Sequence, residues 1–186
     1  ALSYKIKLDT NGTNPEMLEK LISNVIPAKA GIQKRPNGKK EKKNSGSPIR
    51  SGMTEGALFD YIAMDIKAPL DKYEKIAGVK VNLNNIKKSI KIIMEAGIPY
   101  EFRTTVVPGL LNKKDIAKIG ELIKGAEKPP SAHNMSFGEA KWYLQFFKSD
   151  IDLVDAGLKG KKAFGKKEME EMAEIGKKYV KRCEIR

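Results

Sequence analysis

The chain has 186 residues and a net charge of +13, with 36 basic side chains against 23 acidic ones. That length is enough for one domain with a real core. No stretch of about 18 apolar residues exists, which excludes a membrane-spanning helix, and no N-terminal apolar segment marks secretion. The single cysteine, Cys183, excludes an internal disulfide framework and a multi-cysteine metal site built from this chain alone. We therefore expect a cytoplasmic protein.

Residues 24–56 carry close to half of the excess positive charge, with eight basic side chains and two acidic ones. The segment contains a lysine-rich run, Lys39–Lys43, and no sustained hydrophobic period, so it cannot bury enough apolar surface to offset the entropy of ordering. We predict a disordered insertion within a single domain that spans residues 1–186. Val25–Gln33 resembles the translated product of dispersed bacterial DNA repeats. A basic arm that binds nucleic acid is the functional alternative.

Tyr4–Thr10 is predicted to be a strand, because apolar side chains alternate there with lysine and aspartate. Lys5 and Lys7 share one face, which indicates an edge strand or a missing cover. Asn14 and Pro15 suit the N-cap and the first position of a following helix. The buried stripe of that helix would consist of Met17, Leu18, Leu21 and Ile22.

Tyr61–Leu70 is the segment that first points to a site. In a strand, Ile62, Met64 and Ile66 share one face, and Ala63, Asp65 and Lys67 share the other. Pro69 cannot donate a ladder hydrogen bond, so Asp65 and Lys67 lie near the end of the strand. In α/β proteins, ligands bind at this end of the strands. A buried structural ion pair is the alternative interpretation.

Helix and strand patterns then alternate to the end of the chain. We predict one helix opened by Asn84 or Asn85 and ended by Gly97, and another opened by Asn112 and Asp115. The other predicted elements are strands over Pro99–Val107, Trp142–Phe147 and Val180–Ile185, a type II turn at Pro108-Gly109, a loop over Lys128–Ala140 and a helix over Lys166–Tyr179. This alternation predicts an α/β fold with parallel strands. The Gly-rich nucleotide-binding motifs are absent from the sequence.

Three motifs in this order resemble the later barrel strands of the radical S-adenosylmethionine superfamily. They are Leu8-Asp9-Thr10-Asn11-Gly12, the strand from Tyr61 to Pro69 that contains Asp65-Ile66-Lys67, and Tyr100–Gly109. With residues 24–56 set aside, the resemblance covers nearly the whole chain, and it is strongest to activating enzymes of glycyl-radical proteins, of the anaerobic ribonucleotide reductase activating type. It implies the C-terminal part of a partial (β/α)6 TIM-like barrel with parallel strands.

The same resemblance implies an activity and its partners. Members of the family bind a [4Fe-4S] cluster, cleave S-adenosylmethionine reductively, and use the 5′-deoxyadenosyl radical to abstract a hydrogen from a glycine of a partner protein. The expected partners are a glycyl-radical enzyme, in particular anaerobic ribonucleoside-triphosphate reductase, and an electron donor such as flavodoxin or ferredoxin. Neither a membrane nor nucleic acid is expected.

Carried over by position, seven residues would line the S-adenosylmethionine site. Asp9 and Asp65 would hold the methionyl end, directly or through a cation, and Lys67 would reach the ribose or carboxylate. Arg103 and Thr105 would lie beside the adenosyl group, and Thr10 and Asn11 belong to the turn that lines the site. A zwitterionic sulfonium needs carboxylates for its ammonium and cations for its carboxylate, which agrees with this set. Pairing of Arg103 with Glu101 or Asp65 in the absence of any ligand is the alternative.

The sequence departs from the family in the half of the site that holds the cluster. The family's Cys-x-x-x-Cys-x-x-Cys loop and Gly-Gly-Glu strand precede the Asp9–Gly12 turn, and only Ala1–Leu8 precede it here. Cys183 is interpreted as a simple buried or surface thiol and His133 as a solvated loop residue, so no catalytic or metal-binding residue is predicted. We therefore expect the C-terminal part of an activating enzyme, inactive alone. The alternative is a non-catalytic basic α/β domain that binds nucleic acid or a protein partner.

Overall fold

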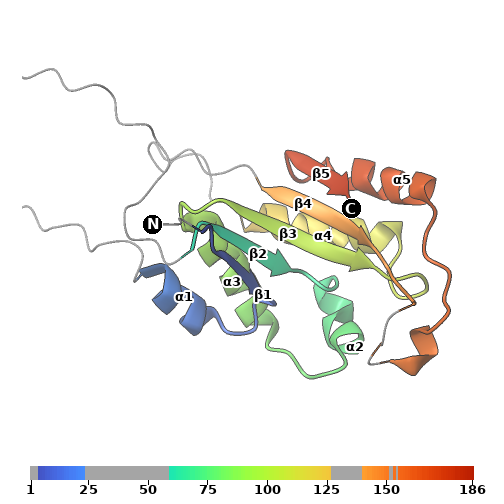
Figure 1. Cartoon of the computed structure of the whole chain (residues 1–186), viewed down its shortest axis with the longest axis horizontal. Coiled ribbons are helices and arrows are strands. Elements are labelled where there is room, and N and C mark those ends of the chain that lie inside the picture. The colour runs from blue at the N-terminus through green and yellow to red at the C-terminus, as the bar shows by residue number, and fades with distance from the viewer. Residues whose placement is uncertain (1–3, 24–58, 127–139, 151–152, 154) are drawn as a thin grey trace, which may run out of the picture.

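The computed structural model describes residues 4–23, 59–126, 140–150, 153 and 155–186, and Figure 1 shows their arrangement. A single five-stranded sheet runs through this part of the chain. Its strands are β1 (Lys7–Thr10), β2 (Tyr61–Asp65), β3 (Tyr100–Val106), β4 (Lys141–Phe146) and β5 (Arg182–Ile185). The α-helices are α1 (Pro15–Ser23), α2 (Tyr73–Ala77), α3 (Leu83–Glu95), α4 (Lys113–Gly125) and α5 (Lys166–Gly176). The 3-10 helices are η1 (Leu70–Lys72) and η2 (Ala156–Leu158).

All the strand pairs are parallel, and the spatial order β1-β2-β3-β4-β5 follows the order along the chain. Each strand therefore pairs with the next, after a connection that returns the chain to the same end of the sheet. This confirms the predicted α/β fold with parallel strands and is consistent with a partial TIM-like barrel. The strands are shorter than the sequence pattern suggested, since β1 begins at Lys7 and β2 ends at Asp65.

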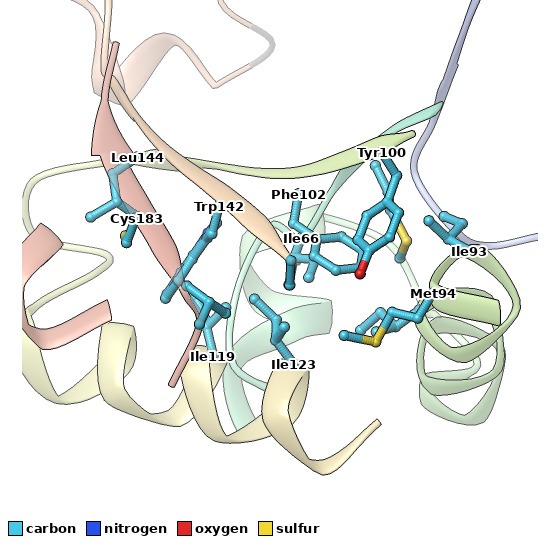
Figure 2. Packing of buried hydrophobic residues seen from close by; sticks show 14 of the residues in the cluster. Ile66, Ile93, Met94, Tyr100, Phe102, Ile119, Ile123, Trp142, Leu144 and Cys183 are labelled. Carbon is cyan, nitrogen blue, oxygen red and sulfur yellow. The ribbon is translucent and has the colours of Figure 1, made fainter. Parts of the chain in front are cut away.

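One face of the sheet is apolar and packs against the helices. Figure 2 shows Met94, Ile119 and Ile123 from the helices beneath Phe102 and Trp142 of the sheet. Several side chains on this side are fully buried, among them Ile62, Met64, Ile66, Phe102, Trp142 and Leu144. Each such side chain contributes roughly 1.5–3 kcal/mol through burial, so the helix-covered side supplies most of the stability of the fold.

The turn after β1 is fixed by contacts with α3. Gly12 has a φ of 74°, and a Cβ at that position would lie 2.1 Å from the Met64 side chain. The Ser89 hydroxyl donates a hydrogen bond to the Gly12 carbonyl at 2.8 Å. Asn14 caps α1, since its side-chain oxygen accepts from the Met17 backbone N–H at 3.0 Å. The Asp9–Gly12 turn is therefore rigidly placed, as a binding turn needs to be.

Two predicted helix boundaries were wrong. The N-cap of α3 is Asn82, whose side chain accepts from the Asn84 backbone N–H at 3.1 Å. Asn85 instead donates its side-chain amide to the Thr13 carbonyl at 2.9 Å, so tertiary contact decides among three similar asparagines. At the other end of the chain, α5 ends at Gly176 and not at Tyr179, because the chain turns there to bring Tyr179 against Gly120 of α4.

Other local predictions are confirmed. The Asn112 side chain and Asp115 form a reciprocal capping box at the start of α4. The Pro108-Gly109 turn has Gly109 at a φ of 83°, the conformation that a type II turn requires at this position. The predicted insertion at 24–56, His133 and all of the Lys128–Ala140 loop except Ala140 lie outside the described residues. Within the described ranges, no helix is long and apolar enough to cross a membrane.

Candidate functional site

The second face of the sheet is polar, although it is built from the same strands as the apolar face. Strand side chains alternate between the two faces, so Met64, Phe102 and Trp142 each have at least one polar neighbour in the sequence that points the other way. The polar face carries Lys7, Asp9, Tyr61, Asp65, Glu101, Arg103, Tyr143 and Arg186, which contact one another in two clusters. One cluster lies at the carboxyl edge of the sheet and the other nearer its centre.

At the carboxyl edge, Arg103 lies between two aspartates. Its Nη2 is 2.6 Å from an Asp9 carboxylate oxygen, and its Nε donates to Asp65 at 2.8 Å. Asp65 and Arg103 are directly paired in the β2–β3 register, and Asp9 reaches them from β1. The Arg103 side chain is 17% exposed, whereas Asp9 and Asp65 are 55% and 41% exposed. The cation is thus mostly covered, and its two carboxylates face solvent.

The two aspartates stabilise the protonated, charged form of Arg103. Burial on its own would lower the pKa of the guanidinium, but Asp65 and then Asp9 raise that pKa above its usual value. A guanidinium has five N–H donors, so two carboxylates do not exhaust its capacity to bind an anion. Arg103 was expected to pair with Glu101 or Asp65 if it bound no ligand. The structure shows the pair with Asp65 and a second pair with Asp9, whereas Glu101 bonds to other side chains.

The other predicted site residues lie around this cluster. Lys67 follows β2 and is exposed, while its backbone N–H approaches the Tyr73 hydroxyl at 3.5 Å. Thr105 is exposed and follows Arg103 by two residues in β3, so it lies on the same face. Its hydroxyl lies 3.5 Å from the Gln145 side-chain oxygen. Thr10 and Asn11 bond within their own turn, where they accept from the backbone N–H groups of Gly12 and Thr13. These two side chains therefore shape the turn.

The central cluster surrounds Glu101, which is only 2% exposed. Its carboxylate accepts hydrogen bonds from Lys7 at 3.1 Å, from the Tyr61 hydroxyl at 3.2 Å and from Arg186 at 3.3 Å. Arg186 reaches Glu101 across the ring of Tyr143, with its guanidinium carbon 3.4 Å from the ring centre. Burial and the nearby Glu101 charge raise the pKa of Tyr61 to about 12. The cluster is a network around one desolvated carboxylate, which bonds to three donors, next to the carboxyl-edge residues.

This central cluster was not predicted from the sequence. Alternation placed Glu101 on the same face as Arg103, and Lys7 on the same face as Asp9, and that was the available signal. The pairing depends on strand register across segments separated by 94, 40 and 85 residues, which local patterns do not specify.

The part of the chain that the structure describes contains no group of three or more histidine, cysteine, aspartate or glutamate side chains able to hold a metal ion. Cys183 lies in the apolar core and is 1% exposed. Burial raises the pKa of its thiol to about 12, so it remains protonated at neutral pH and is unsuited to binding iron. Of the two locations predicted for this thiol, buried or surface, the structure shows the buried one.

Comparison with known proteins gives one informative match. No family model matches the chain. The chain is 26% identical over 187 residues to a protein of Methanocaldococcus jannaschii that is named as a candidate glycyl-radical enzyme activating enzyme. The alignment covers 98% of this chain and 59% of that protein. The chain thus spans about three-fifths of the length of the relative it matches. At this identity, the match supports the family of activating enzymes at most.

Proposed function

We propose that this chain is the C-terminal part of a radical S-adenosylmethionine activating enzyme that serves a glycyl-radical protein. The single observation that carries the proposal is the Asp9–Arg103–Asp65 cluster at the carboxyl edge of a parallel sheet. The likeness to a relative named as an activating enzyme, over nearly the whole chain, supports the same assignment. Parallel α/β proteins bind ligands at this edge, where rigid strand ends hold the side chains.

The carboxyl-edge residues suit the methionyl part of S-adenosylmethionine. Its ammonium needs a carboxylate, which the solvent-facing oxygens of Asp9 and Asp65 supply, and its carboxylate needs a cation, which Arg103 or Lys67 supplies. In the proposal, Thr10 and Asn11 keep the turn in shape, and Thr105 lies on the adenosyl side. Reductive cleavage of this cofactor supplies a 5′-deoxyadenosyl radical, and the residues of this chain bind and orient the cofactor.

The [4Fe-4S] cluster of the family does not fit the residues of this chain. Such a cluster needs three thiolates, and the sequence has one cysteine, whose thiol is buried and protonated. We therefore assign no step of the reaction to this chain alone. In the proposal, a segment bearing the cysteine triad completes the enzyme, the partner is anaerobic ribonucleoside-triphosphate reductase, and flavodoxin or ferredoxin supplies electrons.

Binding of S-adenosylmethionine to the purified chain tests the proposal. We expect weak binding by calorimetry, and a further loss of about tenfold or more in Asp65→Asn, because a charge-assisted hydrogen bond to the ammonium is removed. Asp71→Asn is the matched control, since Asp71 is also a partly exposed aspartate in an ion pair, with Lys118. Equal loss in the two variants, or no binding by the unmodified chain, would contradict the assignment.

Anaerobic reconstitution tests the need for a second segment. With iron and sulfide, we expect Ala1–Arg186 alone to form no stoichiometric cluster and no 5′-deoxyadenosine. Addition of a polypeptide with the cysteine triad should restore both. Formation of the cluster and of 5′-deoxyadenosine by the chain alone would contradict the proposal that a second segment supplies the cluster ligands.

A further inference from the structure

The last part of the connection from β4 to α5, together with the first two residues of α5, is rich in lysine and lies at the same edge of the sheet as the carboxyl-edge cluster. Between Ala156 and Lys167 the sequence has five lysines and no acidic residue. We call Lys159, Lys161, Lys162, Lys166 and Lys167 the basic rim; all five are exposed. In Figure 1 this orange segment runs beyond the arrowheads of β3 and β4. A Cβ built on Gly109, in the turn that follows β3, would lie 3.3 Å from the Lys161 ammonium.

Three of the five charges of the basic rim have no acidic partner among the described residues. Among the described residues, no carboxylate lies within ion-pair distance of Lys159, Lys161 or Lys162, whereas Lys72, Lys113 and Lys118 nearby each pair with one. Lys166 has a long contact of 3.8 Å to Glu170. Lys159, Lys161 and Lys162 are thus held close together without an acidic partner among the described residues, at a cost in mutual repulsion.

The start of α5 adds to this positive potential. Lys166 and Lys167 are the first two residues of the helix. The N-terminal end of a helix carries partial positive charge, so acidic side chains are favoured there and lysines are disfavoured. This charge is offset in part, because Glu168 in the same turn accepts from the Gly165 backbone N–H at 3.0 Å.

We propose that the basic rim is a docking surface for an acidic patch on a protein partner. This rests on the proposed function, in which a partner protein must present its backbone at the carboxyl edge beside Asp9 and Asp65. A positive rim next to the site would orient such a partner and speed its association. The five lysines are flexible point charges, which suit carboxylates spread over a protein surface.

Features of the same surface argue against nucleic acid as the occupant. The aromatic residue of the segment, Phe164, is partly buried against the core and offers no stacking platform for unpaired bases. The rim contains no arginine, the side chain that most often reads guanine in a duplex.

The test compares two triple variants with the same change in net charge. Lys159→Gln/Lys161→Gln/Lys162→Gln neutralises the rim, and Lys87→Gln/Lys91→Gln/Lys124→Gln neutralises three exposed lysines on α3 and α4. The probe is a fluorescent peptide of alternating glutamate and glycine, followed by anisotropy at low and high salt. We expect the rim variant to bind about five- to tenfold more weakly and the control less than about twofold, with both differences shrinking in salt.

A second measurement locates the contact on the full chain. Acetylation of lysines, read by mass spectrometry, should slow at the rim when the peptide is present, and should not change at Lys87, Lys91 or Lys124. Equal weakening in the two triple variants, or no protection at the rim, would overturn the proposal. Tighter binding of a short DNA duplex than of the peptide, lost in the rim variant, would overturn it in favour of nucleic acid.

The outcome is separable from that of the proposed function. The rim variant should retain the S-adenosylmethionine binding of the unmodified chain, which Asp65→Asn should lose. If the unmodified chain does not bind the cofactor but the rim still binds the peptide selectively, the proposed function fails and the docking surface stands. If the cofactor binds and the rim variant behaves as its control, the docking surface fails alone.

Discussion

The two faces of the sheet are made from alternate residues of the same strands, yet one face forms the apolar core and the other carries the charged residues of the candidate site. The helix-covered face is apolar and includes fully buried side chains such as Met64, Phe102 and Trp142. The open face carries three cations and three carboxylates that bond to one another, with Glu101 at the centre and Arg103 at the carboxyl edge. Stability and candidate chemistry are therefore separated by a single residue step along each strand.

The open face also differs within itself. Near its centre, Glu101 is desolvated and held by three donors, which makes that region a fixed platform. At the carboxyl edge, Asp9 and Asp65 keep access to solvent while they share Arg103. Exposed carboxylates on a rigid support are suited to binding a charged ligand, and a buried network is suited to positioning them.

The largest expected difference in unfolding free energy is between substitutions at two adjacent β4 residues that face opposite sides of the sheet. Trp142 is fully buried against the helices, and its ring N–H donates to the Thr104 hydroxyl at 3.0 Å. Trp142→Ala should lower the free energy of unfolding by about 3–5 kcal/mol, through the cavity and the lost hydrogen bond. Tyr143→Phe, on the open face, should change it by less than about 1 kcal/mol, because the ring under Arg186 is retained. Urea unfolding followed by circular dichroism measures both, and similar losses would refute the division between the faces.

A smaller effect is expected at the centre of the open face. Glu101→Gln should lower the free energy of unfolding by about 1–3 kcal/mol, because Lys7 and Arg186 lose their shared counter-charge in a desolvated place. Lys7 and Arg186 are partly exposed and can turn to water, which limits the loss. The control is Glu184→Gln, whose partner Arg182 is in solvent, and little change is expected there. If Glu184→Gln lowers the free energy of unfolding as much as Glu101→Gln does, the burial of Glu101 does not explain the stability of the network.

The sequence was sufficient to predict the apolar face and the edge of the sheet at which the charged residues meet. Hydrophobic alternation in Tyr61–Lys67 specifies which side chains are buried, and parallel strands bring their ends to one edge, so the meeting of Asp9, Asp65 and Arg103 could be anticipated. Their role in binding a cofactor stays a prediction.

Long-range polar pairing could not be predicted in the same way. The contact of Arg186 with Glu101 depends on β5 lying next to β4 and on the side chain crossing Tyr143. Likewise Lys72 reaches the buried Asp115 from η1, a short helix that no local pattern indicated. Charged side chains have several candidate partners in a sequence, and only the tertiary register selects among them.

The last prediction uses one titrating group from each face, and its effect is the smallest. Burial raises the pKa of Cys183 on the helix side from 9.0 to about 12, and raises that of Tyr61 on the open face from 10.0 to about 12. Both groups are neutral when protonated. Above the unfolded-state value, the unfolded chain has therefore released a proton that the folded chain still holds, so stability falls as pH rises. The contribution is fully present below pH 9 for the thiol and below pH 10 for the phenol, and it is lost as pH rises toward about 12.

Because the thiol titrates first in the unfolded chain, it should dominate the early part of this loss. From about pH 8 to about pH 9.5 the unmodified chain should lose roughly 1 kcal/mol more than Cys183→Ala, whereas Tyr61→Phe should follow the unmodified chain in that range. Above pH 10, Tyr61→Phe should fall less steeply as well. Slopes of unfolding free energy against pH, and not absolute stabilities, are compared, since each substitution also changes packing. A Cys183→Ala slope equal to that of the unmodified chain below pH 10 would mean that the thiol is not held in the core in solution, and rapid reaction of the native thiol with Ellman's reagent would show the same independently.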